Sequence, residues 1–196
     1  MGLFESAMRE IGRENYGPAT LELLHRAEQD NRPRALVFST PDAGAEAALK
    51  ALSDQTISKN RRVRMPHDAA ALKAGLWLLF DFMAESHEFS QALATPSGSY
   101  WHGILHRREP DAFNAKYWMA RVGEHPIFPE LLNDARELAV NSIFKDSLQT
   151  MKIWDGKWHV DACCGKHDGA EESVLLEIQR REWALLFDYN FGKAFA

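Results

Sequence analysis

The chain has 196 residues, of which 45% are hydrophobic and 26% are charged, a composition typical of one folded globular domain spanning residues 1–196. Its formal net charge of −5 argues against broad, non-specific binding to nucleic acid, so no nucleic-acid partner is expected. Cys163 and Cys164 are adjacent, which excludes a disulfide framework and departs from the CxxC spacing of zinc sites.

The first five residues lack the basic segment and the apolar core of a secretory signal peptide. The most apolar stretch, residues 75–84, is interrupted by Asp81 and is much shorter than the roughly 20 residues of a membrane-spanning helix. We therefore expect a cytoplasmic protein with no membrane partner.

Residues 1–65 are expected to form short peripheral helices separated by turns. Gly17 and Pro18 open one helix, Pro33 ends it, and Asp42 follows a proline at the start of another. The polar stretch 53–66 is expected to be loop. Only two short segments, 35–38 and 158–160, have strand character, and this scarcity favours an all-α fold.

Residues 66–190 are expected to form the core bundle. Asp68 is expected to cap a central helix over 68–93, whose apolar residues cover most of its circumference. His87 continues one apolar stripe of this helix and should point inward. The segment 154–169 is expected to be loop, and 170–189 the last helix.

A helical hairpin is expected over 97–122, between the central helix and the last helix. Thr95 and Pro96 start its first helix, and Pro110 ends that helix because the residue before a proline disfavours helical ψ. Asp111 is placed to cap the second helix, and Gly123 suits the position after its end. The expected fold is thus a single-domain helical bundle.

His102, His106 and Glu109 in this hairpin are spaced i, i+4 and i+7, so they share one strip of a helix. Two imidazoles and a carboxylate suit a divalent metal such as zinc or iron, with Glu109 as third ligand or general base. Without a metal, the same side chains fit an acid–base or substrate-binding site. They also fit a structural role as hydrogen-bonded core histidines.

His87 and Glu182 are the best candidates to complete this site from other helices. We expect His87 to act as a metal ligand. Glu182 falls within the apolar stripe of the last helix, where a bare carboxylate is costly. It must therefore be paired, bound to a metal or protonated, and an ion pair with an arginine is the favoured state.

Other side chains of the hairpin are candidates for binding a substrate. Arg107 and Arg108 precede a helix start, where guanidinium and free N–H groups favour an anion. A helical wheel turns both away from the histidine strip, so we expect one at the surface and an ion pair with Asp111. The remaining candidates are Asn114, Lys116 and His125.

One face of the hairpin's second helix is a candidate pocket lining. It carries Asn114, Tyr117, Trp118 and Arg121 at helical intervals. A core position for the two aromatic side chains is the alternative.

The run YWHGILHRREPD, continued by NAKYW, RVG and HP up to Pro126, resembles the signature of an uncharacterised family of bacterial and fungal all-helical proteins. Residues 178–183 and 185–189 resemble a second part of it. That family has no assigned activity, so the resemblance implies one structural unit and no reaction. Residues 101–126 also loosely resemble one tetratricopeptide-like unit, but a repeat array needs about three.

Two functions follow as hypotheses. The first is a small-molecule enzyme, metal-dependent and of hydrolase or lyase type, in which Glu109 or Glu182 accepts a proton. The second is a non-catalytic binding or scaffold protein whose buried polar residues fix helix register. The sequence specifies neither the substrate, the metal nor the oligomeric state.

Overall fold

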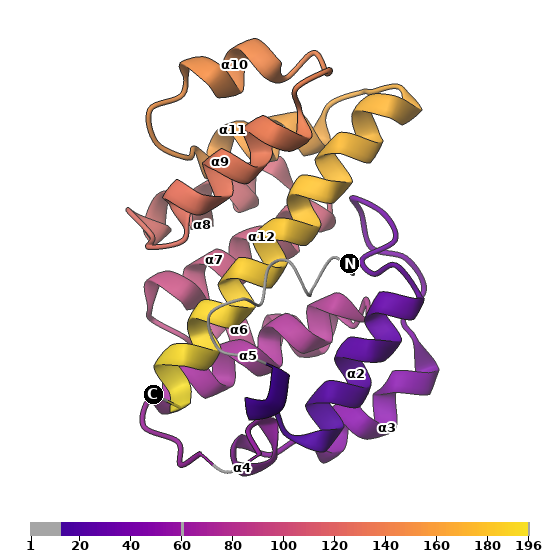
Figure 1. Cartoon of the computed structure of the whole chain (residues 1–196), viewed down its shortest axis with the longest axis vertical. Helices are drawn as coiled ribbons and strands as arrows, with labels where there is room; N and C mark the ends of the chain where they lie inside the picture. The colour runs from indigo at the N-terminus through magenta and orange to yellow at the C-terminus, as the bar shows by residue number, and fades with distance from the viewer. Residues whose placement is uncertain (1–12, 60, 196) are drawn as a thin grey trace.

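The computed structural model describes residues 13–59 and 61–195, which form eleven α-helices and one 3-10 turn (Figure 1). The all-α, single-domain helical fold expected from the sequence is confirmed. Residues 1–12 lie outside the described residues. The expectation about a signal peptide concerns this segment.

The helices follow the turn η1 (Arg13–Asn15) and are, in chain order, α2 (Pro18–Gln29), α3 (Ala43–Ala51), α4 (Asp54–Ile57), α5 (Pro66–Leu79), α6 (Met83–Gln91), α7 (Pro96–Arg108), α8 (Ala112–Val122), α9 (Phe128–Leu138), α10 (Lys145–Thr150), α11 (Gly156–Cys164) and α12 (Gly169–Phe195).

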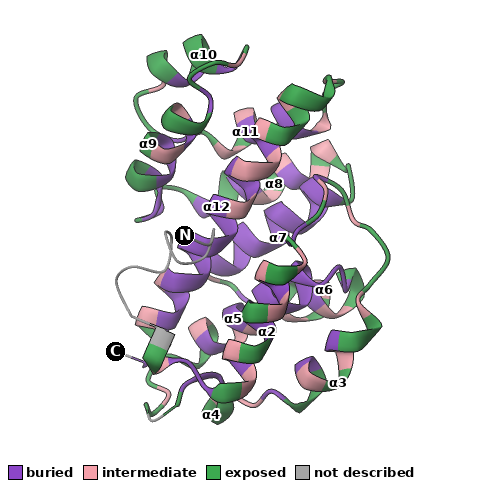
Figure 2. Cartoon of the chain, turned by 45° about the vertical axis from the view of Figure 1, so that its right-hand side comes forward, coloured by how far each residue is buried: buried purple, intermediate pink, exposed green. Residues whose placement is uncertain are grey.

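The long helix α12 runs diagonally through the molecule, with α7 behind it (Figure 1). Helices α2 to α4 lie at one end, near α5, and α8 to α11 lie toward the other. Every residue of α7 from Ser97 to Arg108 is buried, and the purple of Figure 2 marks α7 and much of α12. The most enclosed helix of the bundle is therefore α7, although it carries histidines, arginines and serines.

The predicted central helix 68–93 is two helices, because the chain turns at Asp81 between α5 and α6. Asp81 has a φ of 68°, a left-handed conformation that aspartate adopts more readily than most residues. Its buried carboxylate accepts hydrogen bonds from Arg32 at 3.1 Å and from Arg108 at 2.6 Å. Asp68 is not the cap of α5: the helix begins after Met65, and the Asp68 carboxylate accepts from Asn190 at 2.8 Å.

Two segments expected to be loop and two with strand character are different in the structure. The segment 154–169 contains α11, whose first turn is capped by Asp155 through a hydrogen bond from the Lys157 backbone N–H. The strand expected at 158–160 is therefore wrong, because these residues are helical. Residues 35–38 form no strand, and α4 interrupts the expected loop 53–66.

The hairpin of α7 and α8 is confirmed with the caps that the sequence predicts. Thr95 accepts from the Gly98 backbone N–H, and Asp111 accepts from that of Asn114, each at 3.0 Å. Gly123 follows α8 with a φ of 67°, which favours glycine. Gly103 lets Met119 approach α7 closely, since an added Cβ would lie 2.9 Å from its terminal methyl carbon. This approach brings the side chains of α8 onto the histidine strip of α7.

Arg107 and Arg108 are both buried, so the predicted surface position and the ion pair with Asp111 are wrong. Arg107 binds the Glu182 carboxylate of α12 at 2.5 and 3.2 Å. Arg108 binds Asp81 and donates to the Leu78 carbonyl at 2.7 Å. Adjacent positions on a helix point about 100° apart, so the two guanidinium groups tie α7 to two different neighbours.

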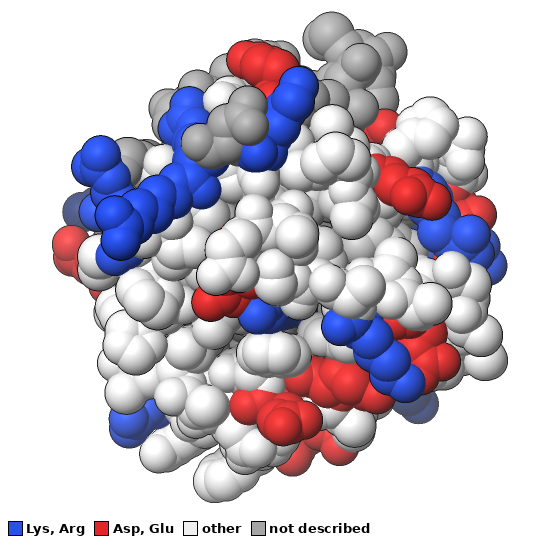
Figure 3. Space-filling view, turned by 90° about the horizontal axis from the view of Figure 1, so that it is seen from below, with Lys and Arg blue, Asp and Glu red and all other residues white. Residues whose placement is uncertain are grey.

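Seen from below, the surface carries a group of Lys and Arg at its upper left and a group of Asp and Glu below its centre, and further charged side chains of both signs lie at the right (Figure 3). No helix of the described residues is both long and apolar enough to cross a membrane.

We predict that Arg108→Met lowers the free energy of unfolding by about 3 kcal/mol, because it removes one partner of a buried carboxylate. Asp81 still pairs with Arg32 in this variant, so the expected loss of unfolding free energy is at the lower end of the range for broken buried ion pairs. Chemical denaturation followed by circular dichroism measures this change.

Arg26→Met is the matched control, because the Arg26 side chain is 43% exposed in its pair with Asp42. Its expected loss is at most about 1 kcal/mol. Equal losses for the two variants would contradict a structural role for the buried pair.

Candidate functional site

Three histidines meet beside α8: His87 of α6 with His102 and His106 of α7. Their ring centroids lie 4.6 Å (His87–His102), 5.6 Å (His87–His106) and 4.8 Å (His102–His106) apart. One ring nitrogen of each lies within 4.8 Å of the others. The structure thus brings together the three residues proposed from the sequence as metal ligands, and we call them the histidine cluster.

His102 is the most enclosed member of the histidine cluster. It is 2% exposed, and both of its ring nitrogens lack a hydrogen-bond partner among the described residues. Its ring stacks on Trp118 of α8, with centroids 4.0 Å apart and planes inclined by 15°. Burial, together with the charges of His106 and His87, lowers the pKa of His102 to about 3. The imidazole is therefore neutral at neutral pH and retains a lone pair for a ligand.

His106 is held by two polar neighbours. Its Nδ1 lies 2.8 Å from a carboxylate oxygen of Glu109, and the side-chain amide nitrogen of Asn114 lies 3.1 Å from its Nε2. Since a carboxylate only accepts, Glu109 favours the tautomer with a proton on Nδ1. This leaves the Nε2 lone pair for Asn114 or for a metal, an arrangement common in metal-binding histidines. Glu109 is therefore placed to orient His106.

His87 is half-buried and lies at the edge of the histidine cluster. Burial, and next the charge of His106, lowers the pKa of His87. In a tetrahedral zinc site with bonds of about 2.0–2.1 Å, ligand nitrogens lie about 3.4 Å apart. The rings must therefore move together slightly to bind one ion, and His87 is the least enclosed of the three.

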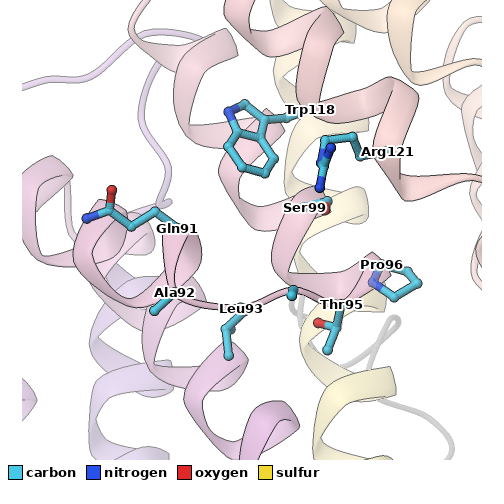
Figure 4. A pocket seen from close by; sticks show the side chains of 9 residues that line it. Gln91, Ala92, Leu93, Thr95, Pro96, Ser99, Trp118 and Arg121 are labelled. Carbon is cyan, nitrogen blue, oxygen red and sulfur yellow. The ribbon is translucent and has the colours of Figure 1, made fainter.

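A pocket of about 420 Å³ lies next to the histidine cluster, between the turn that joins α6 to α7 and the side of α8 (Figure 4). Its lining includes Ser99 of α7, one turn before His102, and both Trp118 and Arg121 of α8. Trp118 thus lines the pocket and also contacts the histidine cluster. Of the predicted pocket face of α8, Trp118 and Arg121 line the pocket and Asn114 contacts His106. Tyr117 is 52% exposed.

Glu182 does not join the histidine cluster. Its carboxylate is fully buried among Arg107, the Tyr100 hydroxyl at 2.9 Å and His159 at 3.4 Å. Burial alone would raise the pKa of Glu182, but the charges and hydrogen bonds of Arg107 and His159 outweigh it and lower this pKa to about 2. The expected arginine partner is confirmed. Arg107 thus holds the Glu182 carboxylate in its ionised form, apart from the histidine cluster, and a role as catalytic proton acceptor stays a prediction.

Three of the predicted substrate-binding side chains are used elsewhere. Arg107 and Arg108 are engaged with buried carboxylates, and Lys116 forms an ion pair with Asp161 of α11. Asn114 is the member of the predicted set that contacts the histidine cluster. Ser99 was not predicted as a site residue, although its i, i+3 spacing from His102 places it on the same face of the helix.

His125 is also separate from the histidine cluster. It is 4% exposed, lies 3.2 Å from the Ser97 hydroxyl and packs against Tyr100, Phe128 and Tyr189. Burial lowers the pKa of His125 to about 4. The enclosed ring therefore contributes to the core and does not face the pocket.

Comparisons with known proteins give no match for this chain among protein-family models, curated proteins or solved structures. Membership in the bacterial and fungal helical family therefore stays a prediction.

The low pKa of His125 predicts a dependence of stability on pH. Between about pH 6.5 and pH 4 the unfolded chain binds a proton at this residue and the folded chain does not, so stability falls as the pH falls. The contribution is on the order of 3 kcal/mol by the bottom of this range. We expect His125→Gln to make the slope of unfolding free energy against pH shallower.

The control for this measurement is His67→Gln, since His67 is exposed on α5. It should leave the slope unchanged. A His125→Gln slope equal to that of the unaltered protein would refute the burial argument.

Proposed function

We propose that His87, His102 and His106 bind one divalent transition-metal ion, such as zinc or iron. The observation that carries this proposal is the buried ring of His102, which lies beside two imidazoles and has neither nitrogen hydrogen-bonded among the described residues. Each unsatisfied buried polar group costs about 1–3 kcal/mol. A bond to a metal would remove this cost at one nitrogen.

We propose further that the protein is a small-molecule enzyme of hydrolase or lyase type. Three imidazoles leave a fourth position for water, and a bound ion would lower the pKa of that water to about 7. Glu109 contacts His106, and its side chain is 39% exposed, so it is within reach of both the histidine cluster and solvent. Its roles in this proposal are to fix the His106 tautomer and to accept a proton.

The alternative is a non-catalytic helical scaffold. It is favoured by the contacts of His106 with Asn114 and Glu109, which satisfy this ring without a metal. Either function fits the proposed cytoplasmic location, the absence of a nucleic-acid partner and membership in the bacterial and fungal helical family.

The metal proposal predicts about one zinc ion per chain after equilibration with zinc and gel filtration, measured by elemental analysis. His102→Ala and His106→Ala should each weaken binding more than 100-fold, beyond the roughly 10–100-fold typical of a residue that only orients a ligand. Circular dichroism should find both variants helical.

The matched control is His67→Ala, which removes an exposed histidine and should keep the full metal content. Unchanged metal content in both cluster variants would exclude the site. Loss of folding in both variants without metal uptake by the unaltered protein would favour the scaffold.

Glu109→Gln distinguishes a carboxylate that orients His106 from one that binds the metal directly. As a residue that orients His106, it should lower zinc affinity about 10–100-fold and leave helical content unchanged. Glu130→Gln, at an exposed position of α9, is the control. If Glu109→Gln lowers affinity as far as His106→Ala does, Glu109 is a direct ligand.

A further inference from the structure

The pocket beside the histidine cluster has the size of a small-molecule site. Its volume of about 420 Å³ lies within the range of about 300–1,000 Å³ found for ligand pockets. One wall is the turn after Gln91, including Leu93 and Pro96, and the other is formed by Trp118 and Arg121 (Figure 4).

Arg121 gives this pocket a positive charge. Its guanidinium lies 5.5 Å from the centre of the Trp118 ring and contacts the Tyr117 hydroxyl at 3.5 Å. It has no carboxylate partner among the described residues, and no Asp or Glu lines the pocket. By contrast, Arg107 and Arg108 on the neighbouring helix are each paired with a carboxylate.

Ser99 is the second polar group of the pocket. It is 6% exposed, and its hydroxyl makes no hydrogen bond to the described residues. The remaining lining includes the apolar side chains of Leu93 and Pro96, and the indole of Trp118 lies on the opposite side of the pocket (Figure 4). A guanidinium and a hydroxyl beside an apolar wall suit a ligand with one anionic end and one apolar end.

We propose that this pocket binds a small organic carboxylate. Arg121 holds the carboxylate group through charge-assisted hydrogen bonds, Ser99 donates one more, and the apolar part of the ligand packs against Trp118 and Leu93. A single cation matches the single charge of a carboxylate. Because Trp118 also stacks on His102, only the Trp118 ring separates a ligand bound here from the histidine cluster. The identification of this ligand as the substrate rests on the proposed metalloenzyme function.

The test is titration calorimetry of the metal-free protein with benzoate, benzamide and inorganic phosphate. Benzoate should bind with a dissociation constant in the millimolar range or tighter, and benzamide and phosphate should each bind at least 10-fold more weakly. Arg121→Gln should weaken benzoate binding about 10–100-fold. Arg121→Lys keeps the charge and should lose less benzoate affinity than Arg121→Gln. Ser99→Ala should lower the benzoate affinity a few-fold.

Arg62→Gln is the matched control, because it removes one positive charge at an exposed position and should leave benzoate binding unchanged. No benzoate binding, equal binding of benzamide or phosphate, or an unchanged affinity in Arg121→Gln would each overturn the proposal. Circular dichroism of the variants establishes that they are folded.

This experiment is independent of the metal. Benzoate binding by a protein that takes up no zinc would remove the proposed enzyme function and keep the carboxylate pocket. Zinc uptake without benzoate binding would remove the pocket proposal alone.

Discussion

The fold depends on the two adjacent arginines that fix the rotation of α7. This helix is buried along its length, so an unpaired guanidinium on it would be costly. Arg107 reaches the Glu182 carboxylate of α12, and Arg108 reaches Asp81 at the turn between α5 and α6. With both pairs formed, α7 has one rotation about its axis, and this rotation turns His102 and His106 toward α6 and α8.

The buried polar groups differ in how fully they are satisfied. Glu182 has Arg107 and Tyr100 as partners, and His125 has the Ser97 hydroxyl. These contacts explain their burial as parts of the core. His102 has ring neighbours but no hydrogen-bond partner among the described residues. That contrast distinguishes His102 from the other buried histidines, each of which has a partner at one ring nitrogen, and makes its cluster the candidate for binding an ion.

The sequence predicted the hairpin and the shared face of His102 and His106 because their determinants are local. Asp111 and Gly123 act within a few residues of where they stand, and the i, i+4 spacing of His102 and His106 places both on one face. The break at Asp81 was not predictable in this way, because it accompanies ion pairs with distant arginines. A helical wheel gave the direction of Arg107 without showing that Glu182 lies opposite. The pocket likewise joins residues from 91 to 121 and exists only after α8 folds onto α7.

X-ray absorption spectroscopy at the zinc edge, on the chain loaded with one equivalent of zinc, tests the central claim most directly. The arrangement of His87, His102 and His106 predicts about three imidazole nitrogens at roughly 2.0 Å, with the outer-shell scattering typical of histidine rings. A first shell of oxygen atoms without that imidazole scattering would show that zinc binds elsewhere. The cluster would then be a packing feature of the core.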